Sequence, residues 1–489
     1  MKKNSLANRD GVILPLVLVF GTLAMIILGG IISWATMNVR AAQQAVKREV
    51  AIQIAESGVE YYRWHLAHAP TDYQDGTGAA GPYLHYFYDK SGDKIGQFTL
   101  TITPPPIGSS IVTVKSEGKS SNNFFGTRTI TTRLAKPSLA KYAVAANSFM
   151  RFGQGTEIFG PIHCNSGIRF DGIAHNVISS AVATFDDPDH SGAAEFGVHT
   201  HVNPPPGTGV DDSFRPLEAP PNTPQARSDV FLAGRQFPVP AVDFTGLTAD
   251  FSQMKTDAQA AGFYRAGSGA MGYHVLLKTN DTFSLYRVDS LKAPPNGCTN
   301  SNNQTGWGSW SINNETLLGT YSLPANGLIF LEDNIFVDGQ INTARVSIVA
   351  AVFPDDPSTR KSITVNNNLL YTNYDGRDVI ALIAQNNINV GLYSQDILRI
   401  DAALIAQKGR AGRYYYESGS KHCDPDDTKN TITLNGMIAS DQRYGFAYTD
   451  GTGYQTRNII YDTNLLYSPP PSFPQTSDQY ITISWAETL

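Results

Sequence analysis

The 489-residue sequence has few charged residues and few cysteines. Charged residues make up only 16% of it, and 37 Lys and Arg against 43 Asp and Glu give a net charge of −6. Because no run of Lys or Arg is present, the composition argues against a nucleic-acid partner. The three cysteines, Cys164, Cys298 and Cys423, match no zinc-binding spacing and allow one disulfide at most. We take Cys298 and Cys423 as the candidate pair.

Recognisable catalytic motifs are also absent. The sequence has no Gly-rich phosphate loop, no G-x-S-x-G turn and no H-E-x-x-H helix. A glycosidase needs two carboxylates at a defined separation, and the acidic segments DDPDHSGAAEF and CDPDDTK follow no catalytic motif. We therefore expect no enzymatic activity. The alternative is a membrane-anchored carbohydrate-active enzyme, either a lyase or a glycoside hydrolase.

The N-terminal region contains a long apolar segment. Three basic residues precede Gly11, and Val12–Trp34 is then almost wholly apolar over 23 residues. At about 1.5 Å per residue, a helix of this length crosses the roughly 30 Å hydrocarbon core of a bilayer. Basic residues flank both ends of the segment, so their charge does not set its orientation.

The helical pattern continues beyond this segment. Apolar residues recur at intervals of three, four or seven, at Val39, Ala42, Val46, Val50, Ile54 and Tyr61. No reliable stop signal interrupts residues 11–66. The sequence therefore predicts one continuous helix of about 80 Å, apolar at one end and amphipathic at the other. A plain membrane anchor with a helical stalk is one interpretation.

A second interpretation is a family resemblance. The basic leader ending in Gly11, the apolar helix and the segment AESGVEYYRW (55–64) resemble the N-terminus of type IV pilin-like proteins. The resemblance is to PilX-type minor pilins and to the minor pseudopilins of type II secretion. It implies that a prepilin peptidase cuts after Gly11 and that Val12 becomes the methylated first residue. The alternative is that Gly11 is not cleaved.

One position departs from the family pattern. These proteins usually carry an acidic residue at the fifth mature position, where this sequence has Leu16. That carboxylate is thought to pair with the terminal ammonium of a neighbouring subunit, because a lone buried charge is costly. By resemblance, a subunit without it suits a tip or initiating position. The resemblance implies filament packing against other pilins through Leu16, Val39, Val46, Val50 and Ile54.

Three segments after the helix have the pattern of β-strands. Residues 97–103, 110–118 and 127–135 alternate apolar and polar side chains, which predicts an antiparallel sheet. Packed on the upper half of the helix, this sheet would cover Val46, Val50 and Ile54. Such a layout is typical of a pilin globular domain.

The rest of the chain is rich in short strands and turns. Four similar passages, IFGPIHCNSGIRF, IFVDGQINTARVSI, ILRIDAALIAQKG and TITLNGMIASDQ, align with Gly160, Gly339, Ala402 and Gly436 in register. Such self-similarity favours a right-handed parallel β-helix, and a β-sandwich is the alternative. The predicted fold is therefore α+β, mostly β.

The predicted segments follow from these patterns. They are the leader peptide (1–11), the transmembrane part of the helix (12–38), the pilin-like helix and sheet (39–136), the first part of the β-helix (137–202), a Pro-rich loop with an α+β insertion (203–327), and the main β-helix with a C-terminal strand (328–489).

Two neighbouring groups of residues are candidate metal ligands. Asp187, Asp189 and Ser191 are spaced like the start of a calcium-binding EF-hand loop, although Val198 replaces its twelfth-position Glu. A solvated acidic loop is the alternative, and no other cofactor is expected. The VHTH segment places His199 and His201 on one face of a strand, where two imidazoles can bind metal, but the sequence shows no third ligand.

These patterns together predict a minor pilin or pseudopilin-like subunit. It would be a single-pass inner-membrane protein before assembly and part of a surface filament afterwards. Its β-helix would serve adhesion or partner binding, to a surface polysaccharide or a protein. Tyr414, Tyr415 and Tyr416 could supply adhesive contacts, or could pack as a loop on the β-helix.

Overall fold

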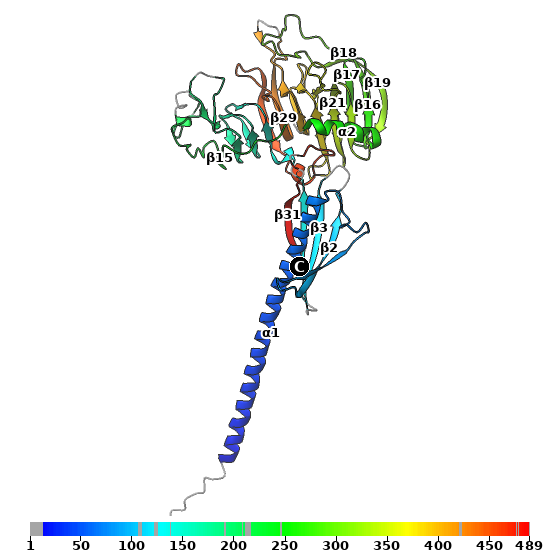
Figure 1. The fold of residues 1–489 in the computed structure, drawn as a ribbon. Coiled ribbons are helices and arrows are strands. Elements are labelled where there is room, and N and C mark those ends of the chain that lie inside the picture. Colours follow the sequence, from blue (N-terminus) through cyan, green and yellow to red (C-terminus); the bar gives the residue numbers. More distant parts are fainter. Residues whose placement is uncertain are drawn as a thin grey trace, which may run out of the picture. The chain divides into compact units, whose positions relative to one another are not determined.

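The computed structural model describes residues 13–105, 110–121, 126–136, 138–189, 192–207, 209–210, 217–244, 247–419, 423–475, 477 and 479–488. The chain forms two compact units (Figure 1). Unit 1 comprises Met1–Pro104, Val112–Leu134 and Ile481–Leu489. Unit 2 comprises Pro105–Ile111 and Ala135–Tyr480.

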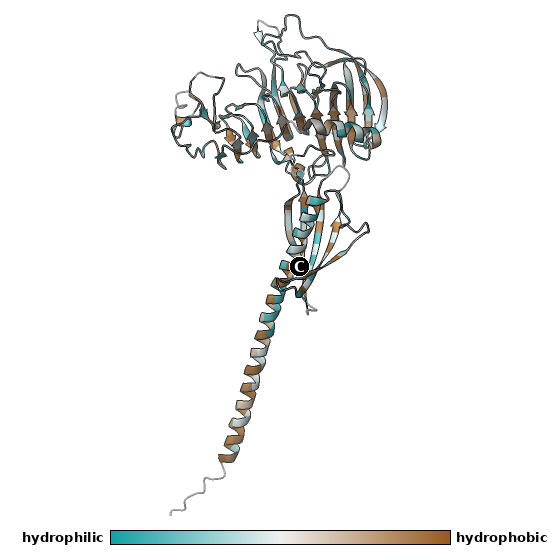
Figure 2. Cartoon of the chain, viewed as in Figure 1, coloured by the Kyte–Doolittle hydropathy of each residue, from teal (hydrophilic) through white to brown (hydrophobic). Residues whose placement is uncertain are grey.

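Unit 1 is built on one long helix. Helix α1 spans Ile13–His68 without interruption, as the sequence predicted. Within the described residues it is the one helix long and apolar enough to cross a membrane. Hydrophobic colours dominate its N-terminal part in Figure 2. Its apolar stretch is not covered by the rest of the described chain.

The C-terminal part of α1 packs on a small sheet. The strands lie in the order β1 (Tyr83–Tyr88), β2 (Lys94–Thr103), β3 (Val112–Ser120), β4 (Thr127–Ala135) and β31 (Ile481–Thr488). The first four form an antiparallel meander. The three predicted strands are thus present, with one strand added at each edge.

The sheet covers less of the helix than the sequence predicted. Ile54 is fully buried, but Val46 is 64% exposed, so the prediction that the sheet covers Val46 is wrong. Burial begins at Ala51. There the helix approaches β3 so closely that a Cβ on Gly118 would overlap the carbonyl oxygen of Ala51. Glycine is required for this contact.

The C-terminal strand β31 belongs to unit 1. The Thr132 hydroxyl on β4 donates to the carbonyl of Ser484 at 2.7 Å, and Arg128 forms an ion pair with Glu487. The sequence grouped this strand with residues 328–489, but in the structure it pairs with β4. A β4 edge left open would present unpaired backbone groups, and β31 covers them.

Unit 2 is dominated by short parallel strands. Its first stretch contains η1 (Leu139–Lys141), β5 (Val144–Ala146), β6 (Met150–Phe152), β7 (Glu157–Phe159), β8 (Ile162–Cys164), β9 (Ile168–Phe170), β10 (Ile173–Ala174), β11 (Ile178–Ser180), β12 (Thr184–Phe185), β13 (Glu195–Phe196), β14 (Val198–His199) and β15 (Arg235–Gln236). Its middle stretch contains α2 (Leu247–Ala261), β16 (Phe263–Arg265), β17 (Gly272–Leu277), β18 (Thr282–Leu291) and β19 (Ile312–Ser322).

The last stretch of unit 2 contains the longest parallel strands. Its elements are β20 (Leu328–Leu331), β21 (Ile335–Ile341), β22 (Arg345–Ala350), β23 (Ile363–Thr364), β24 (Leu369–Tyr371), β25 (Val379–Ala384), β26 (Ile388–Val390), β27 (Ile397–Ala406), β28 (Ala411–Arg413), β29 (Thr428–Ser440), β30 (Gly453–Tyr461) and α3 (Asn464–Tyr467).

One parallel ladder runs through most of unit 2. Its strand order is β16-β20-β22-β25-β27-β29-β5-β8-β11-β15. The pairing of β29 with β5 joins the last stretch of the chain to the first. Strands β16 and β17 belong to the predicted insertion. They pair in parallel with β20 and β21, at the end of the ladder away from β15. A parallel sheet of this many strands is consistent with the predicted β-helix.

Both faces of this ladder are buried. Leu382 and Leu404 are register partners inside the main core, while Ile383 and Ile405 face a second core. Helix α2 contributes Phe251 to that second core. Burial on both faces explains why β25 reads as an unbroken apolar run instead of alternating.

Candidate functional site

The predicted processing and filament-packing residues lie in or near α1. Gly11 and Val12 fall outside the described residues, so cleavage there stays a prediction. Leu16, Val39 and Val46 are exposed on the helix surface, which leaves them available to another subunit. Ile54 is different, because it packs in its own unit, where a Cβ on Gly96 would touch its side chain. It therefore serves the fold of unit 1.

The carboxylates of Asp187 and Asp189, two of the three predicted calcium ligands, have different partners. The Asp189 carboxylate accepts hydrogen bonds from Arg151 at 2.8 Å and from Arg443 at 3.2 Å. Burial alone would raise the pKa of Asp189, but these two arginines outweigh it and hold the pKa below its ordinary value. Ser191 lies outside the described residues. Asp187 points elsewhere, and calcium binding stays a prediction.

Asp187 instead lies beside the two histidines. One ligand atom each from Asp187, His199 and His201 lies within 4.8 Å of the others, and all three residues are buried. Asp187 follows β12, while His199 ends β14 and His201 follows it. The sequence identified the two histidines through their spacing. It gave no sign of Asp187 as their neighbour, because the β12–β13 pairing that brings it back was not predicted.

Two of the cysteines and two of the consecutive tyrosines belong to one buried cluster. Cys298 and Cys423 are joined by a disulfide, with their Cα atoms 4.7 Å apart. Tyr414 and Tyr416 pack in the same cluster and are almost fully buried. Of the two interpretations of these tyrosines, the structure favours a loop packed on the body. Cys164 is a free, buried thiol whose pKa burial raises to about 12.

A groove lined by arginines opens on unit 2. Its volume is about 780 Å³, and among the described residues its lining includes Arg151, Arg410, Arg443 and Arg457 but only one carboxylate, Asp189. Since the whole chain has a net charge of −6, this concentration of positive charge is local. We call it the arginine groove. The sequence gave no signal for it, because its arginines are far apart in the chain.

The arginine groove lies at the joint between the two stretches of unit 2. Arg151 is on β6 in the first stretch, whereas Arg443 follows β29 and Arg457 lies on β30 in the last stretch. The guanidinium of Arg410 lies 4.7 Å from the ring of Tyr414, and its Nη2 is buried without a hydrogen-bond partner among the described residues. The groove therefore offers positive charge to an anionic ligand.

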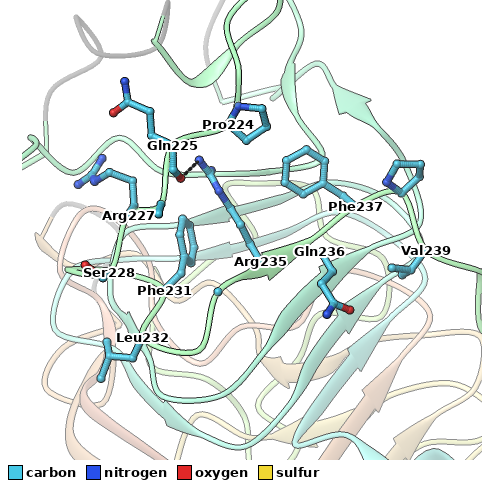
Figure 3. Close-up of a pocket in the computed structure, with 13 residues that line it drawn as sticks. Pro224, Gln225, Arg227, Ser228, Phe231, Leu232, Arg235, Gln236, Phe237 and Val239 are labelled. Carbon is cyan, nitrogen blue, oxygen red and sulfur yellow. Dashed lines mark hydrogen bonds between the residues drawn. The ribbon is translucent and has the colours of Figure 1, made fainter.

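A second cavity, of about 700 Å³, lies beside the terminal strand β15 (Figure 3). Arg235 extends between the rings of Phe231 and Phe237, with its guanidinium carbon 4.9 Å from the first ring centroid and 5.9 Å from the second. The guanidinium donates to the carbonyl of Gln225 at 2.9 Å and pairs with Glu218. Its charge is thus already neutralised, and Arg235 here has a structural role.

A long apolar helix that continues into a helix–sheet unit fits a pilin-like N-terminus, and here the same chain also contains a large body of parallel strands. No family model matches the chain, and no curated protein matches it. A solved structure, the competence-associated pilin ComZ from Thermus thermophilus, aligns over 90% of this chain and 98% of its own, with 12% identity and a TM-score of 0.28. That score is too low to establish a shared fold.

Proposed function

We propose that this chain is a minor pilin or pseudopilin-like subunit of a type IV pilus or a related secretion filament. The main support for the proposal is that the two parts of α1 have different surroundings. Its N-terminal part is apolar and uncovered, and its C-terminal part is buried from Ala51 onward by the sheet of unit 1. A helix of this kind can rest in the inner membrane before assembly and among other pilin helices afterwards.

Maturation and position in the filament form the finer part of the proposal. A prepilin peptidase cuts after Gly11, Val12 becomes the methylated N-terminus, and Leu16 stands where other subunits carry an acid. A subunit without that acid cannot neutralise the terminal ammonium of a neighbour. This supports a position at the tip, of the kind that the PilX-type resemblance implies.

Unit 2 is the part displayed for binding. We propose that its parallel ladder closes into a right-handed β-helix, and that the arginine groove binds an anionic surface polysaccharide. The four arginines that line the groove against one carboxylate support an anionic ligand. Among the residues that line the groove, Asp189 is the one acid, whereas glycoside hydrolysis uses two. The groove therefore favours binding over the enzymatic alternative.

Co-expression with a prepilin peptidase tests the proposal. The mature N-terminus is read by mass spectrometry of the intact chain and of its first peptide. We expect a chain that begins at Val12, and a methyl group on that residue. Expression without the peptidase is the control and should leave the leader in place.

A chain that keeps Met1 in the presence of active peptidase would remove the pilin route and leave α1 as an anchor.

Replacement of Leu16 then tests the tip position. We expect the Leu16→Glu variant to enter filaments along their length, whereas the natural chain is confined to one end, as seen by immunogold labelling. Equal distribution of the two would contradict the tip position.

A further inference from the structure

The buried cluster of Asp187, His199 and His201 is arranged like a set of metal ligands. His199 and His201 are two residues apart on extended backbone, so their side chains leave on the same face. Their rings lie 5.6 Å apart between centroids. Asp187 enters from the segment after β12, and its Oδ2 lies 3.7 Å from Nε2 of His199. All three side chains are withdrawn from solvent.

The hydrogen bond on the other side of His199 fixes where its proton lies. Nδ1 of His199 is 3.0 Å from the carbonyl oxygen of Phe196, which can only accept, so Nδ1 carries the hydrogen. In the neutral ring, Nε2 is then an acceptor. Among the described residues this buried atom has no hydrogen-bond partner. It faces a carboxylate oxygen, which is also an acceptor.

The distance between these two atoms is 3.7 Å. A hydrogen bond between them would be shorter, at about 2.7–3.2 Å. In a tetrahedral zinc site, bonds of about 2.0–2.2 Å place neighbouring ligand atoms about 3.3–3.6 Å apart. The spacing of Asp187 and His199 is therefore close to that of a metal site, and all three ligand atoms, which lie within 4.8 Å of one another, would move closer around an ion.

We propose that Asp187, His199 and His201 bind a divalent transition-metal ion, of which Zn²⁺ is the representative. Two imidazoles and one carboxylate suit Zn²⁺ and its neighbours, whereas Ca²⁺ and Mg²⁺ take oxygen ligands alone. A fourth position is left for water. Because the three ligands are buried and come from two segments, the ion would tie the segment after β12 to β14.

The surroundings hold these ligands in place. Oδ1 of Asp187 accepts the backbone N–H of Asp189 at 2.9 Å, which turns Oδ2 toward the histidines. Asp171 accepts the backbone N–H of His201 at 2.8 Å and so anchors the histidine segment to the neighbouring strand. Metal-binding histidines and carboxylates typically have outer partners of this kind.

Arg169 is the neighbouring charge that such a site must accommodate. Its Nη1 lies 3.7 Å from Oδ2 of Asp187, while its Nε donates to Asp171 at 2.8 Å. Of these two carboxylates, Asp171 is the nearer to the arginine. Without metal, the pairs of Arg169 and His199 with Asp187 would constitute a buried ion network, which is the competing explanation that the experiment must separate.

Metal content of the full-length chain tests the proposal. The protein is purified in detergent, stripped with a chelator, dialysed against Zn²⁺ and measured by inductively coupled plasma mass spectrometry. We expect about one Zn²⁺ per chain, and X-ray absorption with nitrogen and oxygen ligands at about 2.0–2.2 Å. The His199→Gln variant should retain less than about a tenth of that metal.

The matched control is His163→Gln. His163 is equally buried, but it is hydrogen-bonded to Ser179 and Asn165 and lies outside the cluster. This variant should bind Zn²⁺ like the natural chain, and circular dichroism checks that each variant is folded. If His199→Gln does not fold, Asp187→Asn, which preserves shape, replaces it.

Two results would overturn the proposal. One is a folded natural chain that binds no Zn²⁺ or that binds Ca²⁺ in preference. The other is equal Zn²⁺ in the natural chain and in folded His199→Gln or Asp187→Asn. Either result would leave the cluster as an ion network of Asp187, Arg169 and His199.

Discussion

Ile438 on β29 lies directly opposite Val144 on β5, although the two residues are far apart in the sequence. Both are fully buried in the main core of unit 2. This contact is the joint at which the last stretch of the chain meets the first. Because Val144 in turn lies opposite Ile162 on β8, the apolar stack runs across the joint without a break. The arginine groove lies on the outside of the same joint.

The joint should carry much of the stability of unit 2. Replacing Ile438 with Ala leaves a cavity in the stack, and we expect the free energy of unfolding to fall by about 2–5 kcal/mol. Ile397→Ala is the control, because Ile397 is 66% exposed and its truncation should change stability by less than about 0.5 kcal/mol. Urea unfolding of the full chain, followed by tryptophan fluorescence, measures both. Equal midpoints for the two variants would show that the joint is not part of the cooperative core.

The local elements of this fold could be predicted from the sequence. The apolar stretch predicted α1, and alternation predicted strands β2 to β4, because both patterns are set by neighbours along the chain. The alignment of Ala402 with Gly436 is also confirmed, since these residues are register partners on β27 and β29. Similar passages stack because each must bury the same apolar face.

The long-range order could not be predicted in the same way. The sequence around Ile438 does not specify Val144 as its partner, because any buried aliphatic strand could pair there. The return of β31 to unit 1 depends on an open edge at β4, which is visible only when the sheet is assembled. The third ligand of the candidate metal site was missed for the same reason. The sequence grouped Asp187 with Asp189, and the fold turned Asp189 toward Arg443.

The contact of α1 with β3 should tolerate no side chain at Gly118. A methyl group there would overlap the backbone of Ala51 and Ala55, and backbone atoms cannot move aside as a side chain can. We expect Gly118→Ala to destabilise unit 1 by about 1–3 kcal/mol. Hydrogen exchange of the β2–β4 amides, measured by mass spectrometry, should become faster in this variant.

The control for this prediction is the adjacent residue. Glu117 is partly exposed and pairs with Lys115 at the surface, a kind of ion pair that contributes little. Glu117→Ala should therefore leave exchange in β2–β4 almost unchanged. Unchanged exchange in Gly118→Ala would mean that the helix does not lie this close to the sheet.

The stability of unit 2 should depend on the charge of His274. Its Nδ1 lies 2.8 Å from Glu315, and its Nε2 lies 3.3 Å from Asp338. Burial alone would lower the pKa of His274, but the two carboxylates outweigh it and raise the pKa to about 9. The stabilisation is complete below the unfolded-state pKa of about 6.5 and is lost as the pH rises through about 9.

We therefore expect unit 2 to lose roughly 1–3 kcal/mol of stability between pH 6.5 and 9 through this group. The measurement is the urea midpoint as a function of pH, for the natural chain and for His274→Gln. The variant should be less stable at pH 6.5 and should show a flatter profile up to pH 9. Parallel profiles for the two proteins would mean that His274 is neutral in the folded chain.

The arginine groove should bind anionic polysaccharide through its positive charge. Arg443 pairs with Asp189 at the surface of the groove and is 41% exposed, so its side chain can be replaced without opening the core. We expect Arg443→Gln to weaken binding of a uronic-acid polysaccharide by about twofold to fivefold, since one exposed charge contributes about 1 kcal/mol or less. Surface plasmon resonance on immobilised polysaccharide, at several salt concentrations, measures the change.

The control is Arg287→Gln, which removes the same charge from an exposed pair with Asp289 that is not part of the groove lining. It should bind as the natural chain does. The Arg443→Gln and Arg457→Gln changes together should weaken binding further and reduce its dependence on salt, because screening acts on the same charges. If both arginine variants bind like Arg287→Gln, the polysaccharide is held elsewhere on the chain or not at all, and a neutral surface ligand becomes the better hypothesis for unit 2.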